Sequence, residues 1–136
     1  MNRKQEIEQG RLFLPQFNDK GLIPVIAQDV KNNEILMLAY MNQEALDLTI
    51  TSGSAVYYSR SRKKLWKKGE QSGHVQKVQK ILVDCDQDCL VLKVEVDQGQ
   101  CHTGHQSCFY RALVDKDTNI LEFIAQKVFD PDQAYG

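Results

Sequence analysis

Runs of apolar residues separated by short polar stretches divide the chain into segments typical of β-strands. Residues 22–30 and 35–40 are largely apolar, and the polar residues 31–33 between them predict a hairpin. Residues 75–84 and 90–96 are rich in Val, Ile and Leu, so we expect a strand in each. The pattern therefore predicts a sheet built mostly from antiparallel strands.

Three further strands are expected in residues 55–59, 107–114 and 120–124. The last two flank a polar turn and are expected to pair with each other. Residues 129–136 contain a proline and few apolar residues, so this tail is expected to be loose.

Two short helices are expected beside the strands. The first lies within residues 1–15 and ends before Pro15, because a proline disfavours helical geometry in the residue that precedes it. The second covers residues 43–51, since Asn42 is a favourable N-cap and Gly53 a favourable C-terminal stop.

The composition is that of one ordinary globular domain, with 42% hydrophobic and 26% charged residues. The expected elements make an α+β fold, mainly antiparallel β-sheet with one or two short helices. We expect a single domain over residues 1–136, with its core in about residues 20–114.

The charge and hydropathy of the chain exclude several classes of protein. A formal net charge of −1 argues against a general binder of nucleic acid. No apolar run approaches the roughly 20 residues that span a bilayer, so no membrane partner is expected. The charged N-terminus has no apolar stretch behind it, so a secretory signal is not expected. We therefore expect a cytoplasmic location.

Acidic residues alternate with other residues between two of the expected strands. Asp84, Asp86 and Asp88 repel one another when close, and a hard cation such as Mg²⁺ would remove that repulsion. If this segment is extended, Cys85 and Cys89 point to the opposite face. The alternative interpretation is a polar turn, in which Asp is common.

A glycine-bracketed loop supplies two further thiols, Cys101 and Cys108. Together with Cys85 they offer three soft ligands, and three protein ligands with one open position is the arrangement of catalytic zinc. A closed site that adds Cys89 is the structural alternative, and small buried hydrophobes are another. His102, within this loop, could be a ligand, a proton shuttle or a hydrogen-bonding group of the loop.

A basic segment offers groups for phosphate, because six of the nine residues from 60 to 68 are Lys or Arg. Trp66 within it could stack on a base or simply pack. A solvated basic loop and an RNA-binding surface are the alternatives. The candidate substrate-binding residues are Ser59, Arg60, Arg62, Trp66, Lys67, Lys68, Gly69, Ser72 and Gly73.

Several motifs together resemble the phosphoribosyl-AMP cyclohydrolase family, which acts in histidine biosynthesis. In chain order they are Leu36-Met37-Leu38-Ala39-Tyr40-Met41-Asn42, Ser59-Arg60-Ser61-Arg62, Leu65-Trp66-Lys67-Lys68-Gly69, Ser72-Gly73-His74, Asp84-Cys85-Asp86-Gln87-Asp88 and Cys101-His102-Thr103-Gly104 through Ser107-Cys108-Phe109. Each motif alone is weak, and the ordered combination is specific.

The resemblance implies a hydrolase that opens the adenine ring of phosphoribosyl-AMP at the N1–C6 bond, in an intertwined homodimer. It implies one Zn²⁺ per subunit on Cys101, Cys108 and the partner subunit's Cys85, and one Mg²⁺ per subunit on the three aspartates. His102 and His74 are its candidate catalytic residues. The substrate is a small nucleotide.

Two residues depart from the family pattern. Cys89 stands where a small or hydroxyl residue is expected, and His105 stands where a basic residue is expected. The sequence assigns a role to neither.

Overall fold

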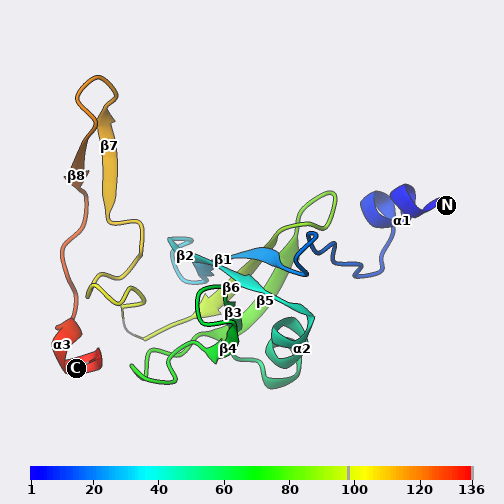
Figure 1. Cartoon of the computed structure of the whole chain (residues 1–136), viewed down its shortest axis with the longest axis horizontal. Coiled ribbons are helices and arrows are strands. Elements are labelled where there is room, and N and C mark those ends of the chain that lie inside the picture. The colour runs from blue at the N-terminus through cyan, green and yellow to red at the C-terminus, as the bar shows by residue number, and fades with distance from the viewer. Residues whose placement is uncertain (98, 136) are drawn as a thin grey trace.

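The computed structural model describes residues 1–97 and 99–135, and it confirms an α+β fold with mainly antiparallel strands and few short helices. Figure 1 shows the elements in space. In chain order they are α1 (Arg3–Gln9), β1 (Ile23–Asp29), β2 (Ile35–Met41), α2 (Gln43–Ser52), β3 (Val56–Ser59), β4 (Lys64–Lys67), β5 (Lys77–Val83), β6 (Leu90–Glu95), β7 (Arg111–Asp115), β8 (Ile120–Phe123) and α3 (Pro131–Tyr135).

A four-stranded sheet in the order β2-β1-β6-β5 forms the centre of the fold. The β1–β2 hairpin is antiparallel, as the sequence predicts. The two strands expected in residues 75–84 and 90–96 pair with each other as the antiparallel β5–β6 hairpin, and β1 joins the two hairpins by a parallel pairing with β6. Alternate residues of β1 are buried, which is the pattern of a strand with one face on the core.

The hydrophobic core lies between this sheet, α2 and the β3–β4 ribbon. Its largest buried side chains include Tyr57, Leu46 and Leu92, each at most 1% exposed. Helix α2 begins after Asn42, whose side chain accepts a hydrogen bond from the Ala45 amide, and ends at Gly53 in the left-handed region, with φ of 75°. The cap residues predicted from sequence are therefore the ones that the structure uses.

The opposite face of the sheet carries a row of apolar residues that crosses all four strands. Ile26 pairs with Leu38 on one side and with Val91 on the other, and Val91 pairs with Leu82. Leu38 is 47% and Leu82 41% exposed. We call these four residues the apolar row.

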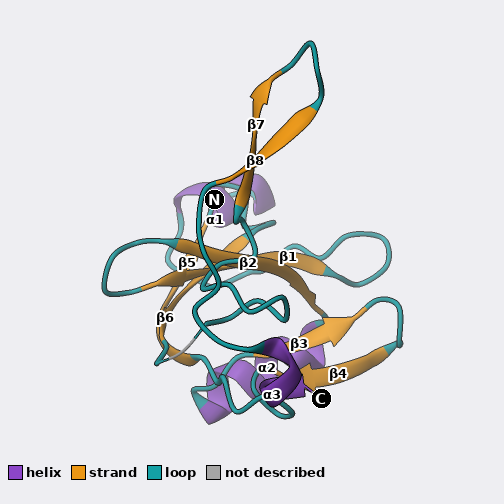
Figure 2. Cartoon of the chain, turned by 90° about the vertical axis from the view of Figure 1, so that its left-hand side faces the viewer, coloured by secondary structure: helices purple, strands orange, loops and turns teal. Residues whose placement is uncertain are grey.

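The β7–β8 hairpin projects away from the sheet (Figures 1 and 2). All four residues of β8 are exposed, and Ile120 and Phe123 are each more than 60% exposed. Its first strand begins at Arg111, later than the expected residue 107, because residues 99–108 form an irregular loop.

Other boundaries also differ from the sequence prediction. Helix α1 stops at Gln9, and the chain that follows is extended and bonded to another loop. Residues 64–67, expected only as part of a basic loop, pair with β3 as strand β4. The tail expected to be loose contains α3 and packs on the domain. Among the described residues, no helix is both long and apolar enough to cross a bilayer.

Thr49 connects α2 to β3 through a buried hydroxyl. This hydroxyl donates to the Ala45 and Val56 carbonyls, at 2.8 and 3.1 Å, and accepts from the Val56 amide at 3.0 Å. Replacing Thr49 with Val leaves these groups without that partner, so we expect the free energy of unfolding to fall by about 1–3 kcal/mol in urea titrations.

Thr51 provides the matched control, because its hydroxyl bonds to the Asp47 carbonyl in the same helix but is exposed. We expect Thr51→Val to change the free energy of unfolding by less than about 0.5 kcal/mol. Equal losses from the two variants would contradict a special role for Thr49.

Candidate functional site

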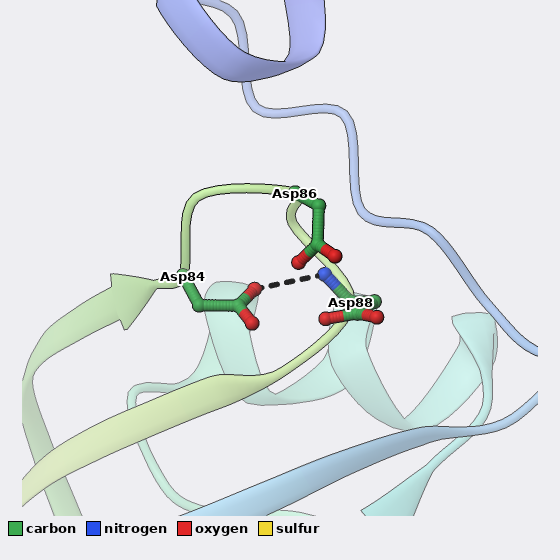
Figure 3. Close-up of side chains that lie close together, drawn as sticks. All are labelled: Asp84, Asp86 and Asp88. Carbon is green, nitrogen blue, oxygen red and sulfur yellow. Dashed lines mark hydrogen bonds between the residues drawn. The ribbon is translucent and has the colours of Figure 1, made fainter. Parts of the chain in front are cut away.

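The segment with three aspartates forms a tight turn between β5 and β6, not the extended strand considered from the sequence. Gln87 adopts φ of 58°, and its amide donates to the Asp84 carbonyl at 3.1 Å. The Asp84 carboxylate accepts from the Asp88 amide at 3.0 Å (Figure 3) and also from the Cys89 amide at 3.2 Å. The turn is thus held by one of its own carboxylates.

This turn brings the three carboxylates together. Oxygens of Asp84, Asp86 and Asp88 lie within 4.8 Å of one another, and all three residues are exposed (Figure 3). Carboxylate oxygens at this spacing suit a hard divalent cation. Among the described residues this is the one cluster with the spacing of a metal site.

The electrostatics of the cluster reflect this crowding. Hydrogen bonds with Asp86 and Asp84, together with desolvation and both negative charges, raise the pKa of Asp88 to about 6. Desolvation acts to raise the pKa of Asp84, but hydrogen bonds from Asp88 and from two backbone amides outweigh it and lower that pKa. Without a cation, the cluster therefore retains a proton at mildly acidic pH.

Gln87 fixes this turn to the N-terminal segment. Although it is only 4% exposed, its side chain accepts from the Leu14 amide at 2.7 Å and donates to the Ile7 and Leu12 carbonyls at 2.9 and 3.2 Å. Its carbonyl accepts from the Gln16 amide at 2.7 Å. No local signal in the sequence indicates this role, since Gln is a common polar turn residue.

Residues 99–108, here called the thiol loop, bring Cys101 and Cys108 together. Cys101 is buried, and its sulfur accepts a hydrogen bond from the Thr103 hydroxyl at 3.0 Å. Desolvation, together with the neighbouring Cys101, raises the pKa of Cys108 to about 12, while the charge of Lys68 opposes this shift.

Lys68 is a cation close enough to this thiol pair to interact with both sulfurs. It is 5% exposed, and its Nζ donates to the Gln100 carbonyl at 2.8 Å. Desolvation lowers the pKa of Lys68, and the charges of Cys108 and Cys101 act against that lowering. Lys68, a candidate phosphate ligand by sequence, thus lies beside the thiols in a buried position.

The other thiols lie at the far end of the β5–β6 hairpin. Gln76, directly before β5, bonds to Gln100 at 3.0 Å, so the thiol loop begins at that end of the hairpin. Strand β5 spans six steps of about 3.3 Å, so this end of the hairpin lies roughly 20 Å from the turn that carries Cys85 and Cys89. A closed site of all four cysteines therefore cannot form within one chain.

The three histidines occupy different environments. His74 is buried, follows Gly73 and has an Nδ1 with no hydrogen-bond partner among the described residues. His102 is exposed in the thiol loop. His105 is buried, its Nδ1 lies 2.8 Å from the Thr103 hydroxyl, and its ring stacks on Tyr110 at 3.8 Å. His105 therefore supports the loop.

The basic segment forms the β3–β4 ribbon and the loop after it. The guanidinium of Arg60 lies 4.1 Å from the centre of the Tyr40 ring, beside a pocket of about 640 Å³ that Ser61 also lines. Arg62 is exposed in the same turn, where its amide donates to the Ser59 hydroxyl at 3.2 Å.

Trp66 both packs against the hydrophobic core and lines a pocket. Its ring lies 5.4 Å from that of Tyr57 and contacts the core, and it borders a pocket of about 260 Å³ with Lys67, Gly69 and Ser72. Gly69 is required here, because a Cβ would lie 2.5 Å from the Val75 nitrogen.

A buried polar network that sequence reasoning missed lies beneath the thiol loop. The Tyr57 hydroxyl donates to Gln76 at 2.7 Å, and Gln76 donates to Gln100. The Ser107 hydroxyl donates to the Ile35 carbonyl at 2.6 Å and accepts from the Phe109 amide. These bonds fix both ends of the loop.

Comparison with known proteins identifies the family. A sequence model of phosphoribosyl-AMP cyclohydrolase matches residues 37–110, which include every candidate site residue. The chain belongs to the phosphoribosyl-AMP cyclohydrolase family. The resemblance found in the sequence is thereby confirmed, and the chain is a hydrolase of this family.

Relatives named phosphoribosyl-AMP cyclohydrolase match over most of their length. The Methanoregula boonei protein is 59% identical over 89% of this chain and 94% of its own. The Rhodopseudomonas palustris TIE-1 protein is 51% identical over 96% of this chain and 89% of its own. The Chlorobium limicola protein is 46% identical over 100% and 98% of the two chains.

The aspartate cluster generates a prediction on cation binding. A divalent cation competes with the proton that the cluster retains, so Mg²⁺ affinity in calorimetric titrations is expected to fall about tenfold between pH 7 and pH 5. Asp88→Asn should weaken binding and flatten this pH dependence. Asp117→Asn, in the exposed β7–β8 turn, is the control and should leave the Mg²⁺ affinity and its pH dependence unchanged. A pH-independent Mg²⁺ affinity in the unaltered protein would contradict the prediction.

Proposed function

We propose that this protein opens the adenine ring of phosphoribosyl-AMP by hydrolysis of the N1–C6 bond, the ring-opening step of histidine biosynthesis. The observation that carries the proposal is the family match over the residues that form the thiol loop and the aspartate turn. In this reaction water adds at C6, the N1–C6 bond breaks and N1 receives a proton.

We propose that Cys101 and Cys108 hold a zinc ion. Their fit is supported by two adjacent soft donors, one of them buried and hydrogen-bonded to Thr103. Zinc bound there would supply Lewis acidity that lowers the pKa of water towards about 7. Lys68 beside the thiols offsets part of their negative charge.

The proposed third thiol is the partner subunit's Cys85. Cys85 of the same chain lies about 20 Å of strand away from the thiol loop, whereas a second copy can present its exposed turn to that loop. Two surfaces are suited to a second copy: the apolar row on the sheet and the exposed β7–β8 hairpin. The proposed assembly is an intertwined homodimer with two shared sites.

The remaining roles follow from charge and position. Asp84, Asp86 and Asp88 would hold Mg²⁺ and thereby place a phosphate of the substrate. Arg60 and Arg62 are exposed, each beside one of the two pockets at Arg60 and Trp66, and would bind phosphate oxygens. His74 and His102 are the proposed groups that hold or move the proton.

Incubating the purified protein with phosphoribosyl-AMP, Zn²⁺ and Mg²⁺ should produce the ultraviolet change of ring opening without release of ammonia. Cys101→Ser is expected to lose bound zinc and to lower turnover about 100-fold or more, since the activated water is lost. No absorbance change in the unaltered protein would contradict the function, and zinc-free Cys101→Ser with full activity would contradict the zinc role.

Subunit complementation tests the shared site. Mixed dimers of Cys85→Ser and Cys101→Ser chains contain one intact site, so random mixing of the two inactive variants should restore about a quarter of normal activity. Cys101→Ser mixed with Cys108→Ser is the matched control, because both thiols come from one loop and no intact site forms. Mixed dimers that are verified by mass spectrometry and remain inactive would contradict the shared site.

A further inference from the structure

The chain returns from the projecting β7–β8 hairpin to the thiol loop. The amides of Val128 and Phe129 both donate to the Gly104 carbonyl, at 2.7 and 3.2 Å, and Lys127 forms an isolated bridge with His105. Residues 127–131, here called the C-terminal strap, therefore lie directly on the loop that carries Cys101 and Cys108.

Phe129 packs against this loop at two glycines. A Cβ at Gly99 would come within 2.7 Å of two ring carbons of Phe129. A Cβ at Gly104, which has φ of 95°, would come within 2.6 Å of the Phe129 carbonyl oxygen. Both glycines leave room for Phe129, so its position is fixed by backbone on two sides.

The ring of Phe129 also contacts His74. The two ring centres are 4.5 Å apart and the ring planes meet at 89°, an edge-to-face arrangement that sets the orientation of the imidazole. His74 is 5% exposed, and its Nδ1 has no hydrogen-bond partner among the described residues. A buried ring nitrogen without a partner is costly, and such exceptions occur where a group is kept for a ligand.

We propose that Phe129 is a positioning residue for the reaction: it holds the His74 imidazole in the orientation in which its free nitrogen meets the substrate. The inference rests on the proposed function for the role of His74, but its geometry is independent of it. Phe129 lies outside the matched residues 37–110. The strap does not line the pockets at Arg60 and Trp66, so Phe129 acts on turnover and not on substrate affinity.

The test compares Phe129→Leu with Phe129→Tyr in the full-length, zinc-loaded protein. Leu retains an apolar side chain but loses the ring, so kcat should fall about tenfold or more while KM changes by less than about twofold. Tyr retains the ring and should recover most of the activity. Leu48→Ala, on α2 and 41% exposed, is the control away from the candidate site and should leave kcat unchanged.

A second readout is independent of activity. The edge-to-face contact places the His74 ring protons in the ring current of Phe129, so their NMR signals should shift in Phe129→Leu and stay in Phe129→Tyr. Bound zinc should equal that of the unaltered protein in both variants.

Three results would overturn the inference: an unchanged kcat in Phe129→Leu, an increase in KM in place of the loss of kcat, or a parallel loss of zinc. Failure of the proposed function is distinguishable from all three, because the unaltered protein would then show no turnover while the NMR shift would still report on the contact.

Discussion

The length of the β5–β6 hairpin is the constraint on which the candidate site depends. Its strands hold the aspartate turn at one end and the thiol loop at the other, and the paired registers from Val83 to Lys77 leave no route by which one chain can fold them together. The three aspartates are thus near one end of the sheet, and the thiols of Cys101, which is buried, and Cys108, which is exposed, are near the other. Under the proposed function the two ends meet one substrate only through a second subunit, because the rise per residue of a strand is nearly constant.

Much of this architecture is predictable because it follows from local chemistry. Apolar periodicity and capping residues that are visible in the sequence predict the β1–β2 hairpin, the strands β5 and β6, and α2 with its caps at Asn42 and Gly53. The convergence of the three aspartates was predicted as well, although through an extended strand where the structure has a turn.

The remaining features depend on contacts between distant residues. Nothing local in Gln76, Gln100 or Tyr57 indicates that they meet in one buried network, because their partners come from separate strands and loops. Strand β4 was not predicted, because its lysines interrupt the apolar pattern by which a strand is recognised. The packing of the tail was not predicted either, because Phe129 packs against Gly99 and Gly104, which come together only when the thiol loop is folded. Burial of Lys68 is likewise a property of the completed fold.

The clamp formed by Gln87 has a practical consequence for handling this protein. One side chain bonds to the backbone at Ile7, Leu12 and Leu14, so the first turns of the chain are tethered to the loop that carries the acidic side chains. Affinity tags and fusion partners joined at the N-terminus would adjoin the segment that makes these hydrogen bonds with Gln87. Fusions at the opposite terminus would adjoin the strap that is bonded to the thiol loop, so an addition at either end of the chain lies next to a segment that holds one of these two loops.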